Sequence, residues 1–208
     1  FVMKRVGLTG SIATGKSTVL NAIAALGIPV FSSDEAVHDL YAGEAVPLVD
    51  ALFPGVGSTG TIDRNELSRR LIAEPHRLAE LEAVVHPLVR KRIARFLDEA
   101  GSAGAKLAVV DIPLLFESGH DWGFDEVWVT AVDPAEQRRR AMHRPGMTGE
   151  KLEAILARQM PQEEKKARAD KVAALAAQDP DLGLAIPDFA KEAWEAMKAA
   201  GKLPVSRA

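Results

Sequence analysis

The strongest chemical signal in the sequence is a glycine-rich segment near the N-terminus, GSIATGKST, which fits the pattern G-x-x-x-x-G-K-[ST]. Glycines in such a loop let backbone N–H groups turn inward around phosphate oxygens, and a following helix adds the positive end of its dipole. Lys16 would then reach the β- and γ-phosphates, and the Ser17 hydroxyl would ligate Mg²⁺. The alternative is a glycine turn that leaves Lys16 in solvent. The predicted nucleotide-binding residues are Gly10, Ser11, Ile12, Ala13, Thr14, Gly15, Lys16, Ser17 and Thr18.

Two aspartates follow apolar runs and are candidates for chemistry beside this loop. Asp34 comes just after the run Pro29–Ser33, where open α/β sheets bind ligands. It could accept a substrate hydroxyl proton or help to hold Mg²⁺, and it could equally be the N-cap of a helix over Glu35–Tyr41. Asp111 lies at the end of the run Lys106–Ile112. An acid there is typical of metal support in phosphate-loop enzymes, and we favour that role over a strand-end cap.

Four arginines follow the last apolar run, within a basic segment. Residues 138–168 contain nine Lys or Arg against four Glu, although the whole chain has a net charge of −3. Arginines on a mobile flap can close over a transferring phosphoryl group. For Arg138, Arg139 and Arg140 a solvated helix face is the favoured interpretation. Arg144 precedes the hinge-like Pro145-Gly146 pair, so it is the predicted lid arginine.

The elements that must position these residues are predicted from hydrophobic runs. Four short continuous runs indicate buried strands of a parallel sheet: Arg5–Thr9, Pro29–Ser33, Lys106–Ile112 and Glu126–Val132. Helical patterns cover Lys16–Leu26 and Pro134–His143. The mostly helical stretch between the second and third runs is too long for a simple crossover, so we expect an inserted helical subdomain. The predicted fold class is α/β, with a parallel sheet between helices, a helical insert and a helical lid.

The expected domain organisation follows from these elements. Residues 3–33 and 101–135 form the nucleotide-binding core, and residues 34–100 form an insert that binds the phosphoryl acceptor. Residues 136–170 form the lid. Residues 171–208 are expected to be a helical tail that returns to the core, because Lys171–Gln178 contains few β-branched residues.

Composition excludes several classes of protein. With 208 residues, 47% of them hydrophobic and 26% charged, the chain is typical of a globular protein. It contains no cysteine, which excludes disulfides, thiol catalysis and cysteine-ligated metals. The charge balance gives no basic field for nucleic acid, and no apolar run reaches the ~18 residues that a membrane span needs. We expect a cytoplasmic protein that is a monomer or a weak homo-oligomer.

Other motifs argue against competing functions. The glycines Gly55, Gly57 and Gly60 spell the dinucleotide fingerprint G-x-G-x-x-G, but no strand precedes them, so we interpret them as a surface loop. The base-reading motif Asn-Lys-x-Asp of GTPases is absent. The five histidines show no i, i+4 pair for a metal site, and His86-Pro87 is expected to mark a helix boundary.

Several segments taken together resemble dephospho-CoA kinases. They are VGLTGSIATGKST at 6–18, SSDEA at 32–36, HPL at 86–88, DIPLLFESG at 111–119 and RQMP at 158–161. The resemblance extends through about Asp170. It implies transfer of a phosphoryl group from ATP, with Mg²⁺, to the 3′-hydroxyl of the ribose of dephospho-CoA, the last step of coenzyme A synthesis. It also implies a core sheet, a helical acceptor-binding subdomain and a lid.

The resemblance assigns roles to individual residues. The loop would bind ATP, Asp34 would be the general base, and Arg144 would be the lid arginine. His86, Asp111 and Leu114 would lie near the acceptor or the metal.

Two features depart from the family pattern. Ser32 stands where the family has a first acid, and the segment after Asp170 lacks the family's fifth-strand pattern and Asn-x-Gly turn, so the adenine contacts are not assigned. Two alternative functions stay open: another phosphate-loop kinase with a different small acceptor, and a non-catalytic nucleotide-binding protein.

Overall fold

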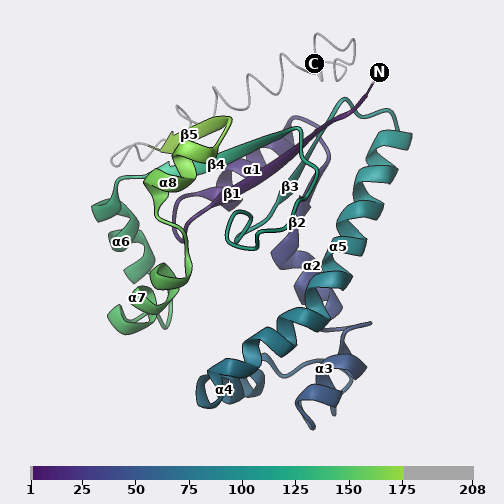
Figure 1. Ribbon diagram of the computed structural model, residues 1–208, viewed down its shortest axis with the longest axis vertical. Helices are drawn as coiled ribbons and strands as arrows, with labels where there is room; N and C mark the ends of the chain where they lie inside the picture. Colours follow the sequence, from purple (N-terminus) through teal and green to yellow (C-terminus); the bar gives the residue numbers. More distant parts are fainter. Residues whose placement is uncertain (1, 176–208) are drawn as a thin grey trace. The chain divides into compact units, whose positions relative to one another are not determined.

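The computed structural model describes residues 2–175, which include a five-stranded sheet and the helices labelled in the ribbon diagram (Figure 1). The sheet has the order β2-β3-β1-β4-β5. Its strands are β1 (Lys4–Gly10), β2 (Val30–Ser32), β3 (Leu107–Asp111), β4 (Glu126–Val132) and β5 (Lys171–Leu175). β1 pairs in parallel with both β3 and β4, and β4 pairs in parallel with β5. The predicted α/β class with a parallel sheet is therefore confirmed.

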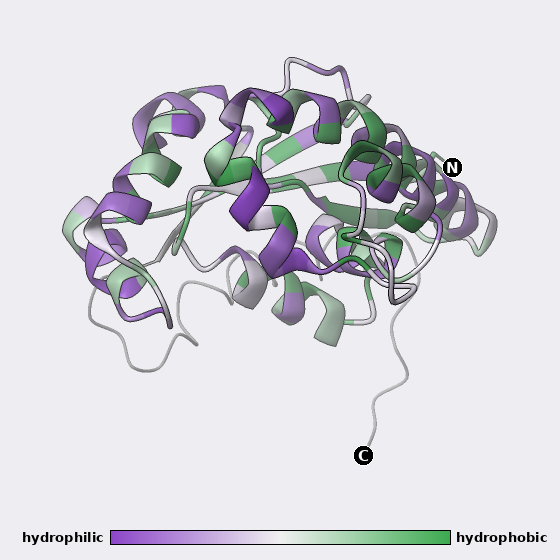
Figure 2. Ribbon diagram, turned by 90° about the horizontal axis from the view of Figure 1, so that it is seen from below, coloured by the Kyte–Doolittle hydropathy of each residue, from purple (hydrophilic) through white to green (hydrophobic). Residues whose placement is uncertain are grey.

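The chain forms two compact units, one of residues 1–31 together with those from 99 onward, and one of residues 32–98. In the first unit, β1 and β3 are almost entirely buried, as continuous apolar runs in a parallel sheet should be. The helix α1 (Lys16–Ala25) packs on them through Val19, Leu20 and Ile23. Figure 2 shows the strands of the sheet coloured mostly as hydrophobic. This core fixes the end of β1, from which the glycine-rich loop starts.

The loop between β3 and β4 lies directly on β1 because Gly7 has no side chain. A Cβ at Gly7 would come within 2.6 Å of the Phe124 ring and 2.8 Å of Leu115. Asp125 completes the contact, since its N–H donates to the Arg5 carbonyl and its carboxylate accepts from the Arg5 N–H at 2.7 Å. The segment after Asp111 is thereby held against the sheet.

Three helices after β4 form what we call the arm: α6 (Pro134–Met142), α7 (Gly149–Arg158) and α8 (Gln162–Arg168). Asp133 caps α6, and Thr148 caps α7. The arm is largely hydrophilic (Figure 2), with a small apolar cluster of Ala141 and Leu152 that includes Ala13 of the glycine-rich loop. The arm is therefore attached to the loop by packing as well as by the chain.

The unit of residues 32–98 contains α2 (Ser33–Leu40), α3 (Val46–Leu52), α4 (Arg64–Ala73), the short 3₁₀ helix Pro75–Arg77 and most of α5 (Leu78–Ser102). The expected helix boundary at His86-Pro87 is wrong, because α5 runs through Pro87. A stripe of buried residues at four-residue spacing, Leu81, Val85, Val89 and Ile93, holds the helix together. Pro87 lies on the exposed face, where water can satisfy the carbonyl that loses its N–H partner.

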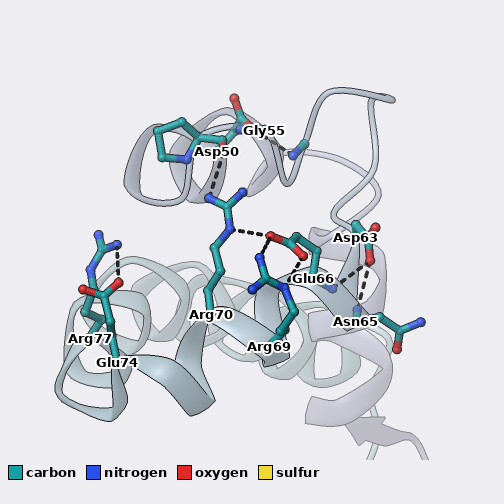
Figure 3. Close-up of polar contacts among 11 residues, drawn as sticks. Asp50, Gly55, Asp63, Asn65, Glu66, Arg69, Arg70, Glu74 and Arg77 are labelled. Carbon is teal, nitrogen blue, oxygen red and sulfur yellow. Dashed lines mark hydrogen bonds and ion pairs between the residues drawn. The ribbon is translucent and has the colours of Figure 1, made fainter.

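The glycines Gly55, Gly57 and Gly60 lie in a loop between α3 and α4, as predicted, and no strand precedes them. Asp50 accepts hydrogen bonds from the N–H groups of Gly55 (3.0 Å) and Gly57 (2.7 Å). Figure 3 shows this loop next to Arg70, which lies in the last turn of α4 and donates to the Pro54 carbonyl at 2.8 Å. The loop N–H groups are thus engaged by a side chain of their own unit, which differs from a dinucleotide site.

The expected helix after Asp170 is wrong for the part that the structure describes, because Lys171–Leu175 form the strand β5. The Asp170 carboxylate accepts from the Val127 N–H at 2.7 Å, and the Asp170 N–H donates to the Val127 carbonyl at 2.8 Å. These bonds start the parallel pairing with β4, and that pairing outweighs the helix propensity of the alanines. The rest of the expected tail, 176–208, lies outside the described residues.

Candidate active site

The glycine-rich loop is held in shape by buried hydroxyl groups. The Thr14 hydroxyl donates to the Ser11 carbonyl at 2.7 Å and lies 2.7 Å from the Thr130 hydroxyl of β4. A Cβ on Gly10 would overlap the Thr130 hydroxyl, so only glycine fits at that point. Thr14 and Thr130 are fully buried. The loop is therefore a rigid turn rather than a free surface segment.

The N-terminus of α1 is arranged to receive an anion. Gly15 is the N-cap residue with φ 83°, a left-handed conformation that favours glycine. No side chain caps α1, and its first turn contains no acid. By contrast, α2, α4, α6 and α7 each have a side-chain cap. The N–H groups and the positive dipole end of α1 are thus left for a ligand such as phosphate.

Lys16 and Asp111 form an ion pair at the base of the loop. The side chains are 13% and 4% exposed, so each charge depends on the other for compensation. Asp111 ends β3, which pairs with β1 in register, and this pairing is what brings the carboxylate to the loop. The structure therefore joins the two residues that the sequence placed 95 positions apart.

The oxygen donors near the loop suit a hard cation. The Asp111 carboxylate and the exposed Ser17 hydroxyl on the first turn of α1 are of the kind that Mg²⁺ prefers. Among residues 2–175 there is no group of three or more acidic or histidine side chains that could hold a metal by itself. A metal here would therefore need phosphate oxygens to complete its shell, which is the usual arrangement for Mg²⁺ with nucleotides.

The four arginines that the sequence analysis singled out after β4 separate into two kinds. Arg138 pairs with Glu153, while Arg139 and Arg140 both pair with Glu136 at 2.6 Å. Hydrogen bonds from Arg139 and Arg140 lower the pKa of Glu136 to about 2. Arg144 is exposed in the turn between α6 and α7, and its side chain makes no hydrogen bond or ion pair within residues 2–175.

The remaining predicted site residues lie in different places. Leu114 is half-buried in the segment after β3, and its carbonyl accepts from the Ser118 N–H. Asp34 and His86 belong to the unit of residues 32–98, where both are exposed. The interpretation of Asp34 as a helix N-cap is wrong. Ser32 is the N-cap of α2, and its hydroxyl accepts from the Glu35 N–H at 3.3 Å.

A buried ion pair that the sequence analysis did not single out connects the segment after β3 to the arm. Lys165 of α8 is fully buried and lies 2.8 Å from the Glu117 carboxylate, which also accepts from the Met160 N–H at 2.7 Å. Burial alone would raise the pKa of Glu117, but the hydrogen bonds from Lys165 and Met160 bring it below its usual value. The signal available was Glu117 at the end of the apolar DIPLLF segment.

Three glutamines of the arm, Gln137, Gln159 and Gln162, were also missed as individual residues. Gln159 lies in the segment RQMP, which entered the sequence analysis only as part of a resemblance. Gln137 is buried among arginines on α6, and a buried amide in a charged helix is the signal that could have identified it.

Comparison with known proteins places the chain in a family. A protein from Rhizobium meliloti named dephospho-CoA kinase is 54% identical over 165 residues, which cover 79% of this chain and 85% of that protein. The crystal structure of TT1252 from Thermus thermophilus has a TM-score of 0.75 at 33% identity and covers 97% of this chain and 100% of that chain. A dephospho-CoA kinase from Campylobacter jejuni has the same fold, with a TM-score of 0.60 at 24% identity, and covers 95% of this chain and 97% of that chain.

The family model described as dephospho-CoA kinase matches residues 4–178, which include the glycine-rich loop, Asp111, Arg144 and all three glutamines. On this match and on the relative from Rhizobium meliloti, the chain belongs to the dephospho-CoA kinase family.

Proposed function

We propose that this protein transfers the γ-phosphoryl group of ATP to the 3′-hydroxyl of the ribose of dephospho-CoA, which gives coenzyme A. The observation that carries the proposal is the N-terminus of α1, which has no side-chain cap and where Lys16 is paired with Asp111, in a chain that belongs to a family of kinases. Membership of that family implies the use of ATP.

The loop residues Gly10–Thr18 have the chemistry to hold the triphosphate. Their N–H groups and the start of α1 would bind phosphate oxygens, and Lys16 would move its ammonium group from Asp111 toward the β- and γ-phosphates. The Asp111 carboxylate would then hold Mg²⁺ together with the Ser17 hydroxyl. When bound, Mg²⁺ would neutralise charge on the phosphates.

Asp34 is proposed as the general base that takes the proton of the acceptor hydroxyl. Its support is its position two residues after β2, its exposure, and the finding that Ser32 rather than Asp34 caps α2. His86 and Leu114 are proposed to contact the acceptor. Ser32 stands where the family pattern has its first acid. Because the Ser32 hydroxyl caps α2, the absence of that acid does not destabilise the start of the helix.

Arg144 is proposed as the residue that stabilises the charge of the transferring group, with the arm acting as a lid. Its neighbours Arg138, Arg139 and Arg140 are already engaged by glutamates, while Arg144 lies in a turn beside Pro145 and Gly146. An arginine supplied in this way can contribute about 10³–10⁵ in rate. Closure of the lid would also keep water from the γ-phosphate.

The proposed localisation, partners and oligomeric state belong to the same proposal. Among the residues that the structure describes, no helix combines the length and the apolarity that a membrane crossing requires. We place the protein in the cytoplasm, with dephospho-CoA as its partner and no nucleic acid, as a monomer or weak homo-oligomer.

The proposal is tested by ADP formation from ATP with and without dephospho-CoA. The wild-type protein should release ADP only when the acceptor is present. Lys16→Ala should lose about 10²–10³ in turnover and bind ATP weakly, because the cation on the phosphates is gone. Asp34→Asn should lose about 10²–10⁴ in turnover with ATP binding intact, because only the proton acceptor is removed.

Two variants serve as matched controls for Asp34→Asn and Lys16→Ala. Glu35→Gln removes an exposed acid from the same first turn of α2, and Lys91→Ala removes an exposed lysine of α5, so both should retain turnover. A protein that binds ATP but forms no ADP with dephospho-CoA, or that prefers another acceptor in a panel of small alcohols and nucleotides, would contradict the proposal.

A further inference from the structure

Both backbone polar groups of Ile12, in the glycine-rich loop, are occupied by glutamine side chains of the arm. The Ile12 N–H donates to Gln159 Oε1 at 3.0 Å, and Gln137 Nε2 donates to the Ile12 carbonyl at 2.8 Å. Gln159 follows α7, and Gln137 lies within α6. Two separate parts of the arm therefore hold one residue of the loop.

A third glutamine fixes the orientation of this network. Gln162 Nε2 donates to Gln137 Oε1 at 2.8 Å, and the Val132 N–H at the end of β4 donates to Gln162 Oε1 at 3.0 Å. Because Gln137 Oε1 accepts from Gln162, its amide nitrogen must face Ile12. Gln137 is 5% exposed, so this orientation is fixed away from water. The network runs from the sheet through α8 and α6 to the loop.

Apolar packing holds the next residue of the loop in an unusual conformation. Ala13 has φ 59°, which a residue with a Cβ adopts at a cost. Its side chain is buried against Ala141 of α6 and Leu152 of α7. The arm therefore grips the loop at two successive residues, by hydrogen bonds at Ile12 and by packing at Ala13.

We propose that Gln137 and Gln159 are positioning residues that set the conformation of the glycine-rich loop for the nucleotide. The inference rests on the proposed function in one respect, namely that this loop binds ATP. The residues after Ile12 supply the N–H groups for the phosphates, so a loop already fixed at Ile12 needs less ordering when ATP binds. Gln137 and Gln159 touch neither phosphate nor acceptor in this role.

A matched pair of substitutions isolates the hydrogen bonds. Gln137→Glu replaces the donor to the Ile12 carbonyl by an acceptor, whereas Gln159→Glu keeps an acceptor for the Ile12 N–H. Both variants add one negative charge beside the loop, so the charge itself is matched, although position 137 is the more buried of the two. In calorimetric titrations with MgATP at pH 8, Gln137→Glu should bind about tenfold more weakly than Gln159→Glu. Gln159→Leu should likewise bind more weakly than Gln159→Glu.

The pH dependence gives a second readout, taken only from protein that circular dichroism shows to be folded at each pH, because a buried carboxylate also destabilises the fold at high pH. Burial raises the pKa of a carboxyl group, and a protonated Glu at position 137 can donate to the Ile12 carbonyl again. The ATP affinity of Gln137→Glu relative to wild type should therefore recover as the pH falls from 8 to about 5.5. The affinity for dephospho-CoA alone should change little in each variant. The thermal midpoint of Gln137→Glu should be lower at pH 8, because its buried carboxylate is charged there, so the ATP titrations are run well below that midpoint.

Lys16→Ala is measured alongside, so that the two proposals can fail separately. If Lys16→Ala binds ATP like wild type, the assignment of the loop as the ATP site is wrong. If Lys16→Ala loses ATP but Gln137→Glu and Gln159→Leu bind it like wild type, the positioning role is overturned and the proposed function stands. Equal losses in Gln137→Glu and Gln159→Glu, with no recovery at lower pH, would also overturn the positioning role.

Discussion

The helices α4 and α6 begin with the same sequence pattern, Asp-x-x-Glu-x-x-Arg-Arg, although one lies in the unit of residues 32–98 and the other in the arm. Asp63 accepts from the N–H groups of Asn65 and Glu66 at 3.0 Å, and Glu66 then pairs with Arg69 and Arg70 (Figure 3). Residues 133–140 repeat this arrangement, with the cap at Asp133 and the glutamate at Glu136. Local sequence thus builds two equivalent helix starts.

The two starts differ at the position after the glutamate. In α4 this position is Leu67, 4% exposed, and in α6 it is Gln137, 5% exposed. Both backbone N–H groups donate to the capping aspartate's carbonyl, at 2.9 and 2.8 Å. The same scaffold therefore delivers an apolar side chain to a core in one case and an amide to the glycine-rich loop in the other. One buried residue therefore decides whether the first turn of the helix contributes to core packing or contacts the glycine-rich loop.

The largest effect that separates the two helix starts is expected from Leu67→Gln. The substitution places an amide where the surroundings are apolar, so the free energy of unfolding should fall by about 2–4 kcal/mol. ATP affinity should stay at the wild-type value, because the loop and its glutamines belong to the other unit. Urea unfolding and ATP titration measure the two quantities.

A surface leucine provides the control for this substitution. Leu48 is 45% exposed, so Leu48→Gln should change stability by less than about 0.5 kcal/mol. If Leu67→Gln is as stable as wild type, Leu67 does not contribute to core packing in α4. That result would contradict the proposed difference between Leu67 and Gln137.

Removal of the N-caps should lower the stability of the protein by the same amount in α4 and in α6, and by less than Leu67→Gln does. ATP binding should be weaker only when the cap of α6 is removed. Asp63→Ala and Asp133→Ala should each lower the free energy of unfolding by about 1 kcal/mol, because two N–H groups lose their acceptor. Only Asp133→Ala should also weaken ATP binding, since it loosens the turn that presents Gln137. Thermal unfolding and ATP titration follow both effects. The matched variants Asp63→Asn and Asp133→Asn keep an acceptor oxygen and should stay near wild type; weaker ATP binding in both alanine variants would remove the functional distinction.

Much of the fold could be predicted from the sequence because β1, β3 and β4 are continuous apolar runs that are mostly buried. The predicted strand Glu126–Val132 matches β4 in both bounds, and the predicted Lys106–Ile112 exceeds β3 by one residue at each end. The strand β5 could not be predicted in this way. Its formation depends on the edge of β4 and on the two hydrogen bonds between Asp170 and Val127, which no local pattern reports.

The residues of the candidate site likewise divide into those that the local sequence identifies and those that only the fold brings together. Glycine spacing identifies the loop, because the requirement for positive φ is local, as at Gly15, whereas the close approach at Gly10 is to Thr130 of β4. The partners of Ile12 lie 125 and 147 residues away in the sequence, so only the fold brings the glutamines to it. The N-cap alternative for Asp34 is wrong for a local reason: Ser32 and Asp34 are both good N-cap residues, and the backbone turns at Ser32.

The smallest effect concerns the charge of the two glutamates, which should titrate alike if the helix starts are equivalent. Hydrogen bonds from Arg69 and Arg70 lower the pKa of Glu66 from 4.5 to about 2, and Arg139 and Arg140 lower that of Glu136 to the same value. A carboxyl group whose pKa is lower in the folded state adds stability above its unfolded pKa, and this contribution is lost as the pH falls from about 4.5 toward 2. Carboxyl carbon NMR shifts from pH 7 to 3.5 should therefore show neither glutamate beginning to protonate. Arg70→Ala should raise the pKa of Glu66 alone and Arg140→Ala that of Glu136 alone; a glutamate that titrates near 4.5 in the wild type would show that its helix start lacks the paired arrangement.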